Sequence, residues 1–377
     1  MPFADELIGT NTAQRLVTAI ARAAPGHDLV ALRAALGALT GLTLRERADL
    51  LRDALLSDLP GSYDDVAEVV RAAAVGSEPF DGWLIWPVTA AIAQKAIADN
   101  TSAAFDDAMD VMAELTQRLS AEFAIRALLR HDLDRALPIV QQWTASSDVD
   151  VRRLATEGTR PYLPWATRVP QILARPGVTV PVLNALYRDD SEYVRRSVAN
   201  HLNDLSRDQP DLVVDTARRW LATPGAQTRQ LVRHGLRTLV KHGHRGALEL
   251  LGFAPATVKI DGPVLDQTVI PYGGTLAFSA TVHNPGPEPA RLAIDYVVHH
   301  RRADGSLSGK TFKLTTRTLA AGETMTVSRE HSFRPITTRR YYPGGHAVAL
   351  QVNGLTTDPV DFELLVPDQQ ASFGDDI

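Results

Sequence analysis

The sequence predicts two architectures in succession, a HEAT-like α-helical repeat solenoid over residues 1–252 and an immunoglobulin-like β-sandwich over residues 255–366. Three observations support this multidomain α-then-β fold class. Apolar residues recur at helical spacing in the first part, a related segment returns there at intervals of about 40 residues, and the period becomes two after Gly252. Residues 367–377 carry three aspartates and predict a disordered acidic tail.

The first 252 residues have the pattern of short helices separated by turns. Leucine, valine and alanine recur at intervals of three and four in residues 16–21, 29–39, 50–56 and 66–73, with proline and glycine between these segments. Alanine and leucine, which favour helix, dominate this part, and runs of β-branched residues are scarce. We therefore expect it to be all-α.

A repeated segment indicates the kind of helical fold. The segment from Asp148 to Ala155 (DVDVRRLA) returns at residues 190–199 (DSEYVRRSVA) and more faintly at residues 228–236. The repeat valines are 43 and 38 residues apart, close to the period of about 40 to 47 residues of two-helix HEAT repeats. In each second helix we expect the acidic residue to cap the N-terminus, the valine to pack inward and the arginines to emerge on an exposed face.

After Gly252 the pattern becomes that of β-strands. Segments with alternating polarity occupy residues 275–282, 292–298, 310–314, 325–327 and 346–352. Six to eight short strands over about 110 residues are typical of an immunoglobulin-type sandwich. Because the chain has no cysteine, the usual disulfide of that fold is excluded.

Composition and motifs exclude several function classes. The absence of cysteine rules out thiol catalysis, Fe–S clusters and Cys-ligated zinc, and favours a reducing compartment. Walker A, GxGxxG and GxSxG motifs are absent, so no nucleotide cofactor or serine-hydrolase chemistry is indicated. The close histidine pairs at residues 242–244 and 299–300 have no third ligand nearby. We expect no metal site and no cofactor, and interpret these histidines as loop or surface residues.

No targeting or membrane segment is indicated. The N-terminal residues MPFADE lack the regions of a signal peptide, and no segment approaches the roughly 18 apolar residues that span a bilayer, so a cytoplasmic protein without a membrane partner is expected. We also expect a monomer.

The charge distribution points to an anion-binding surface. The formal charge of -5 hides an excess of basic residues within 121–252, where 18 of 19 are arginine. Arginine suits bidentate contacts to phosphate, although a salt-bridged, solvated helix face explains the charge as well.

One carboxylate, Glu157, lies where a helix disfavours it. A helix that ends near Gly158 places Glu157 at its C-terminal end, where the helix dipole repels an anion. The nearby candidates for compensation are Arg152, Arg153 and Arg160. As an alternative, a glycine cap, a stop at Pro161 and Trp165 as core filler explain this segment except for Glu157.

Two further carboxylates accompany Glu157. Measured from the repeat valines, Asp204 lies four residues beyond the position of Glu157, about one helical turn, so both are expected to face the same surface from adjacent helices. Glu122 starts an earlier helix. For each residue alone a helix cap or an ion pair is the simpler role. Together, beside Trp165 and among arginines, they predict a site for a cationic ligand next to a polyanion.

The segments around these residues resemble a known family. The matching segments are EFAIR at 122–126, RRLATEGTRPYLPW at 152–165, HLND at 201–204 and ELIG at 6–9. They resemble the AlkC-type DNA alkylation-repair proteins, HEAT-like repeat DNA glycosylases of which some carry a C-terminal immunoglobulin-like domain. Two departures are visible, Ala127 where the family often has proline and Tyr162 where it often has a basic residue.

The resemblance implies a monofunctional DNA glycosylase that excises cationic N-alkylated bases, such as 3-methyladenine and 3-methylcytosine, from double-stranded DNA. Glu122, Glu157 and Asp204 would be the catalytic carboxylates, and Trp165 would contact the lesion. A cationic base is already a good leaving group, so carboxylates that stabilise an oxocarbenium-like sugar and align water suffice. No lysine occurs in residues 121–240, so no lyase step is expected. The arginines expected to hold phosphates are Arg152, Arg153, Arg160, Arg195, Arg196 and Arg233.

Two questions stay open at this level. A non-catalytic HEAT-repeat scaffold that binds a protein or nucleic acid is the alternative function, although a scaffold has no need of carboxylates among arginines. The β-sandwich is either a DNA clamp or a solubilising or docking module. The cations that favour the clamp are His299, His300, Arg301, Arg302, Lys310, Lys313, Arg317, Arg339 and Arg340.

Overall fold

The computed structural model describes residues 4–175, 177–253, 257–337 and 339–367. The last helical residue is Leu250 and the first strand residue is Lys259, so the predicted order of a helical region and a β-sandwich is confirmed. By its contacts the chain divides into two units, residues 1–209 with 220–235 and residues 210–219 with 236–377. Among the described residues, none of the helices combines the length and apolarity that a membrane crossing needs.

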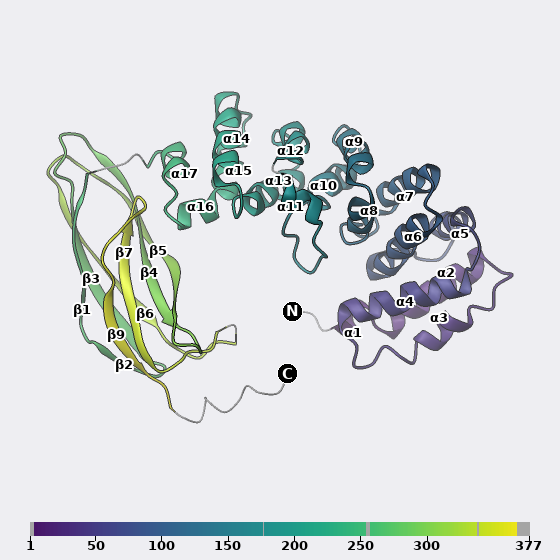
Figure 1. Ribbon diagram of the computed structural model, residues 1–377, viewed down its shortest axis with the longest axis horizontal. Helices are drawn as coiled ribbons and strands as arrows, with labels where there is room; N and C mark the ends of the chain where they lie inside the picture. Colours follow the sequence, from purple (N-terminus) through teal and green to yellow (C-terminus); the bar gives the residue numbers. More distant parts are fainter. Residues whose placement is uncertain (1–3, 176, 254–256, 338, 368–377) are drawn as a thin grey trace. The chain divides into compact units, whose positions relative to one another are not determined.

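The helical region is a succession of short helices (Figure 1). They are α1 (Ala4–Leu7), α2 (Thr10–Ala23), α3 (Val30–Ala35), α4 (Leu44–Asp58), α5 (Tyr63–Val75), the 3-10 turn η1 (Gly82–Leu84), α6 (Ile85–Asp99), α7 (Ser102–Leu115), α8 (Ile125–His131), α9 (Leu133–Trp143), α10 (Val149–Glu157), α11 (Pro170–Ala174), α12 (Val180–Leu186), α13 (Glu192–Leu205), α14 (Pro210–Ala222), α15 (Thr228–Gly235), α16 (Arg237–Lys241) and α17 (Arg245–Leu250). Helix α10 packs against α13, and α13 packs against α15. The three segments related in sequence therefore form a row of neighbouring helices.

The repeat motif starts α10 as its sequence predicts. The carboxylate of Asp148 accepts hydrogen bonds from the backbone N–H groups of Asp150 (2.7 Å) and Val151 (3.4 Å), which confirms the acidic cap. In α13 the N-cap residue is Ser191, whose side chain makes no capping bond. Its backbone N–H donates instead to Asp189 Oδ1 at 2.9 Å. The cap therefore differs between the two repeats.

The core of the helical region contains the valines that the repeat motif predicts. Val151 and Val194 are both buried. The expectation that the arginines of α10 emerge on an exposed face is wrong, because Arg152 and Arg153 are only 19% and 15% exposed. Both are drawn inward by ion pairs with carboxylates of neighbouring elements.

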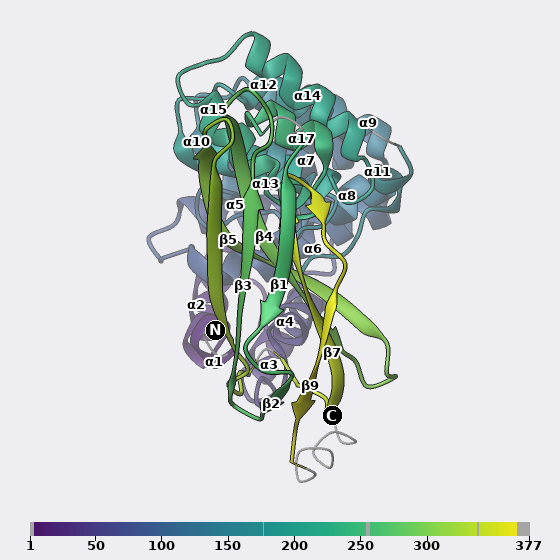
Figure 2. The same cartoon turned by 90° about the vertical axis from the view of Figure 1, so that its left-hand side faces the viewer.

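The β-sandwich consists of two sheets. Its strands are β1 (Lys259–Leu265), β2 (Val269–Pro271), β3 (Thr275–His283), β4 (Ala290–Arg301), β5 (Leu307–Leu319), β6 (Thr324–Ser332), β7 (Gly344–Val352), β8 (Leu355–Thr356) and β9 (Val360–Leu365). One sheet has the order β1-β3-β6, and the other has the order β2-β9-β7-β4-β5 with β8 paired to β7. The pairing is antiparallel except between β2 and β9, and the long strands β4 and β5 lie side by side (Figure 2).

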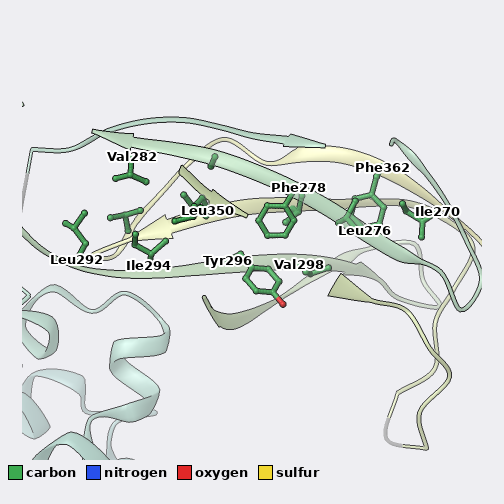
Figure 3. Close-up of a cluster of buried hydrophobic side chains, with 14 of the residues drawn as sticks. Ile270, Leu276, Phe278, Val282, Leu292, Ile294, Tyr296, Val298, Leu350 and Phe362 are labelled. Carbon is green, nitrogen blue, oxygen red and sulfur yellow. The ribbon is translucent and has the colours of Figure 1, made fainter. Parts of the chain in front are cut away.

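Alternating residues of β3 and β4 fill the space between the two sheets. Leu276, Phe278 and Val282 of β3 and Ile294 and Tyr296 of β4 belong to one buried cluster (Figure 3). The five predicted segments all lie within strands, but strands β4 and β5 are longer than expected. Much of β5 is polar, and its length comes from continuous pairing with β4 rather than from an apolar pattern of its own.

His300 and the C-terminal tail differ in how they compare with the sequence-based expectations. The interpretation of His300 as a loop or surface residue is wrong, because it lies in β4, is 7% exposed and contacts the rings of Phe333 and Tyr341. The predicted acidic tail over residues 367–377 lies outside the described residues, apart from Pro367.

Candidate functional site

The three predicted carboxylates come from three parts of the helical region. Glu157 is the last residue of α10, and Asp204 is the penultimate residue of α13. Glu122 lies in the turn before α8. Since α8 begins at Ile125, the expectation that Glu122 itself starts a helix is wrong. The fold nevertheless brings all three carboxylates to the same pair of arginines.

Arg160 joins Glu157 to Asp204. Its Nη1 donates to Glu157 Oε1 at 2.6 Å, while its Nε and Nη2 donate to Asp204 Oδ2 and Oδ1 at 2.9 and 3.2 Å. Asp204 also accepts a bond from the backbone N–H of Tyr162 at 3.3 Å. All three charged side chains are less than 10% exposed. Glu157 and Asp204 therefore meet at one arginine from adjacent helices, but both are buried rather than exposed on a common surface as expected.

Arg153 joins Glu157 to Glu122. Its Nη1 lies 2.7 Å from Glu122 Oε2, and its Nη2 lies 3.7 Å from Glu157 Oε1. The hydroxyl of Ser120 completes this end of the network, since it donates to Glu122 Oε2 at 2.8 Å and accepts from Arg153 at 2.9 Å. The ring of Tyr193 lies under the guanidinium at 4.9 Å. Arg153 is thus held on several sides within the protein.

The ionised form of Glu157 is favoured at its place in the helix. Burial raises the pKa of Glu157, but the charges of Arg153 and Arg160 and the hydrogen bond from Ser197 outweigh burial and bring the pKa below its ordinary value. Two of the three arginines expected to compensate Glu157 do so. The third, Arg152, pairs with Asp189 at 2.6 Å instead.

A buried Arg126 holds the turn that follows Glu157. It is fully buried and donates to the backbone carbonyls of Gly158 (3.0 Å), Arg160 (2.9 Å) and Thr167. Burial and the nearby charges of Arg168 and Arg160 lower its pKa to about 10. These bonds fix the turn that carries Arg160 and Trp165. The segment EFAIR therefore contributes twice, since its first residue, Glu122, belongs to the carboxylate network and its last, Arg126, holds the turn that carries Arg160.

Several polar residues behind Glu157 were not identified from the sequence. The hydroxyl of Ser197 on α13 donates to Glu157 Oε2 at 2.6 Å and is hydrogen-bonded to the hydroxyl of Thr156. His201 is fully buried between the carbonyl of Thr156 and the hydroxyl of Thr179, each 2.9 Å from a ring nitrogen, and burial lowers its pKa to about 4. A signal existed, because Ser197 occupies the aligned position of the apolar Leu154.

The network opens on a pocket of about 460 Å³. Its lining includes Glu122, Glu157, Arg153, Arg160, Trp83, Phe123, Trp165 and Tyr193. Asp204 is not among the lining residues and lies behind Arg160. Trp165 is 56% exposed and has a φ angle of 60°, in the left-handed region that bulky residues avoid, so the interpretation of Trp165 as core filler is wrong. Its carbonyl accepts a bond from Arg45.

Comparisons with known proteins show which family this chain resembles. The family model described as "Uncharacterised protein YhaZ, C-terminal Ig-like domain" matches residues 259–366. The uncharacterised protein YhaZ of Bacillus subtilis (strain 168) is 32% identical over 324 residues, which are 86% of this chain and 88% of that protein. The structure of the Pseudomonas fluorescens alkylpurine DNA glycosylase AlkC, bound to DNA containing an abasic site analog, is 33% identical with a TM-score of 0.80, over 97% of this chain and all of that chain. This chain belongs to the AlkC family.

Membership of the AlkC family confirms the resemblance, including the helical repeats followed by an immunoglobulin-like domain. One departure from the usual AlkC-type sequence, Tyr162, has a clear structural setting. The guanidinium groups of Arg168 and Arg207 lie 4.9 and 4.5 Å from the centre of its ring, and its hydroxyl donates to Asp208 at 2.6 Å. Two exposed arginines therefore flank the position where many AlkC-type proteins have a basic residue.

The six arginines predicted to hold phosphates fall into three groups in this AlkC-family protein. Arg153 and Arg160 belong to the carboxylate network. Arg152 and Arg195 each donate to two backbone carbonyls of the turn before their own helix. Arg196 and Arg233 are exposed, and neither forms an ion pair with another described residue. Contact with phosphate stays a prediction for all six.

The β-sandwich has a cationic pocket of its own, of about 450 Å³. The basic residues that line it are His300, Arg301, Arg302, Lys310, Arg339 and Arg340. His299, Lys313 and Arg317 are not part of this lining. The expectation that His300 is a cation is wrong, because burial and the charge of Arg339 lower its pKa to about 3. Within the part of the chain that the structure describes, no group of three or more histidine, aspartate or glutamate residues is placed to hold a metal ion.

Proposed function

We propose that this protein is a monofunctional DNA glycosylase that hydrolyses the N-glycosidic bond of positively charged N-alkylated bases, of the 3-methyladenine and 3-methylcytosine type, in double-stranded DNA. The observation that carries this proposal is the network in which Glu122, Glu157 and Asp204 share Arg153 and Arg160 beside a pocket. The similarity to AlkC over nearly the whole chain supports it.

The chemistry of the reaction fits a site built of carboxylates. An alkylated base is a cation before the reaction begins, so it leaves with the electron pair of the bond and becomes neutral without being protonated. The site must then supply negative charge near the oxocarbenium-like sugar and a carboxylate that orients water and takes its proton. Glu122 and Glu157 line the pocket, and Asp204 acts through Arg160, whose guanidinium it shares with Glu157.

Charge provides the selectivity in this proposal. Three carboxylates share two arginines in this network, and two of those carboxylates line the pocket, which favours a cationic base over a neutral one. The exposed ring of Trp165 adds an aromatic face, which attracts a cation more strongly than a neutral base. The described lining of the pocket includes no lysine. We therefore propose hydrolysis alone, without a Schiff-base step.

We assign the phosphate contacts first to the exposed pair, Arg196 and Arg233, since their guanidinium groups have no competing ion pair among the described residues. Arg152 and Arg195 shape the turns before α10 and α13, and Arg153 and Arg160 hold the carboxylates. No cofactor enters the proposal.

The test is the release of free 3-methyladenine and 3-methylcytosine from alkylated duplex DNA by the full-length protein. Glu157→Gln and Asp204→Asn should each reduce the release rate by about 100-fold or more, with duplex binding retained. Asp208→Asn is the matched control, because Asp208 is an exposed carboxylate that bonds Tyr162 outside the pocket. It should release bases at the wild-type rate.

Three outcomes contradict parts of the proposal. Release that survives both Glu157→Gln and Asp204→Asn would remove these residues from the site. A nicked abasic product would contradict a purely hydrolytic enzyme. No release of any alkylated base by the wild-type protein would leave the non-catalytic scaffold as the better reading.

A further inference from the structure

Ser197 breaks the pattern of the helical repeat. In the alignment of α10, α13 and α15 on their valines, Leu154, Ser197 and Gly235 occupy the same position. Leu154 is fully buried, and Ser197 is 3% exposed. A hydroxyl at a buried apolar position costs stability unless it is hydrogen-bonded. Departures of this kind from a local pattern are expected at functional sites.

The hydroxyl of Ser197 is bonded to the candidate site. Its Oγ donates to Glu157 Oε2 at 2.6 Å, across the contact between α13 and α10. The other oxygen of the carboxylate, Oε1, faces Arg160 at 2.6 Å and Arg153 at 3.7 Å. Each oxygen of Glu157 therefore has its own partner. The cations bind one oxygen, and Ser197 holds the other and so fixes the rotation of the carboxylate.

A chain of buried groups fixes the direction of this hydrogen bond. The hydroxyl of Ser197 has one proton, and that proton is committed to Glu157, so the single hydroxyl proton of Thr156 is shared between Ser197 Oγ and the backbone carbonyl of Arg153, 3.1 Å away. The backbone of Thr156 is held in turn by His201, whose Nδ1 lies 2.9 Å from the Thr156 carbonyl. The low pKa of His201 keeps its ring neutral near pH 7, and its other nitrogen then accepts from Thr179.

We propose that Ser197 is a positioning residue that sets the orientation of the Glu157 carboxylate toward the pocket, with Thr156 and His201 as its support. This inference rests on the proposed glycosylase function, because the orientation matters only if Glu157 acts on a ligand. It assigns a role to a side chain that has no contact with the pocket itself.

The charge environment of Glu157 gives the expected sign of a pH effect. The titratable and charged groups around it are Arg153, Arg160, Glu122, Asp204, Tyr193 and His201. The hydrogen bond from Ser197 is one of the contributions that lower the pKa of Glu157. Loss of the hydroxyl should raise that pKa, so the acidic limb of the pH–rate profile should move to higher pH.

The experiment compares Ser197→Ala with Ser206→Ala in the full-length protein. Ser206 is also a buried serine, at the C-cap of α13, but its hydroxyl donates to the carbonyl of Asn203 at 2.6 Å and not to a site carboxylate. We expect Ser197→Ala to slow single-turnover base release by roughly tenfold, to move the acidic limb to higher pH and to leave duplex affinity unchanged. Ser206→Ala should change neither the rate of base release nor the position of the acidic limb. Ser197→Thr, which keeps a hydroxyl, should restore the wild-type pH–rate profile.

A carboxyl ¹³C NMR titration of Glu157, assigned through Glu157→Gln, separates this inference from the proposed function. A raised Glu157 pKa in Ser197→Ala supports the hydrogen bond by which Ser197 holds the carboxylate even if the wild-type protein releases no base, in which case the glycosylase proposal fails and the catalytic consequence of the positioning fails with it. If the wild-type protein releases bases and Ser197→Ala matches Ser206→Ala in titration, rate and pH profile, the positioning role is overturned.

Discussion

Helices α10 and α13 begin with the same motif, and in both helices its first arginine donates hydrogen bonds to the backbone of the preceding turn. Arg152 donates to the carbonyls of Ser146 and Ser147 at 3.0 and 3.1 Å, and Arg195 donates to the carbonyls of Asp189 and Asp190 at 2.6 and 2.7 Å. In each case the carbonyls lie six and five residues before the arginine. The shared part of the motif therefore builds the turn between helices.

The residues that follow differ, and the differences make the site. Arg153 is buried against Glu122 and Glu157, whereas its counterpart Arg196 is exposed. Further along, Leu154 and Gly158 of α10 correspond to the polar residues Ser197 and His201 of α13, and the carboxylate of Glu157 corresponds to the amide of Asn200. Gly158 leaves no room for a side chain, because an added Cβ would lie 2.8 Å from Ile125. Matching residues thus stabilise the stack, and the departures carry the candidate chemistry.

Removal of Arg160 tests whether the carboxylates of α10 and α13 depend on the arginine that they share. Arg160→Ala leaves Glu157 and Asp204 buried without the cation they share, which should reduce the free energy of unfolding by about 3 to 5 kcal/mol. Tryptophan fluorescence is a selective measure, since all five tryptophans lie in the helical region.

Arg196→Ala is the matched control for that experiment, because Arg196 is exposed and outside the network. It should change the free energy of unfolding by no more than about 0.5 kcal/mol. A cost below about 1 kcal/mol for Arg160→Ala would mean that the carboxylates do not depend on this arginine.

The second prediction concerns His201, which stands where α10 has Gly158. Its folded-state pKa of about 4 lies below the ordinary 6.5, so the unfolded chain binds the proton first as the pH falls. The stability linked to His201 is therefore fully present above pH 6.5 and is lost as the pH falls to about 4, by about 3 kcal/mol in all.

His201→Gln removes this titration. Denaturant unfolding followed by tryptophan fluorescence at several pH values should show a flatter dependence between pH 6.5 and 4 than in the wild-type protein. Equal slopes in the two proteins would show that His201 is already protonated in the fold or does not titrate over this range.

Features carried by local sequence could be predicted, and features carried by packing could not. The repeat, the cap at Asp148 and the placement of Glu157 at a helix end are all read from neighbouring residues. The partner of Arg152 was not, because Asp189 lies 37 residues away and is brought close only by the packing of successive repeats. The support from Ser197 depends in the same way on which face of α13 meets α10.

The smallest expected effect concerns the arginines and the salt dependence of duplex binding. A side chain that neutralises one phosphate contributes about one counterion to the slope of log K against log salt. Arg196→Ala and Arg233→Ala should each lower that slope by about one, since both side chains are exposed. Arg195→Ala should leave it unchanged and instead destabilise the fold, because its guanidinium is bonded to the turn before α13. An unchanged slope in Arg196→Ala together with a reduced slope in Arg195→Ala would reverse the division between turn-building and phosphate-binding arginines, and would mean that the turn contacts are given up when DNA binds.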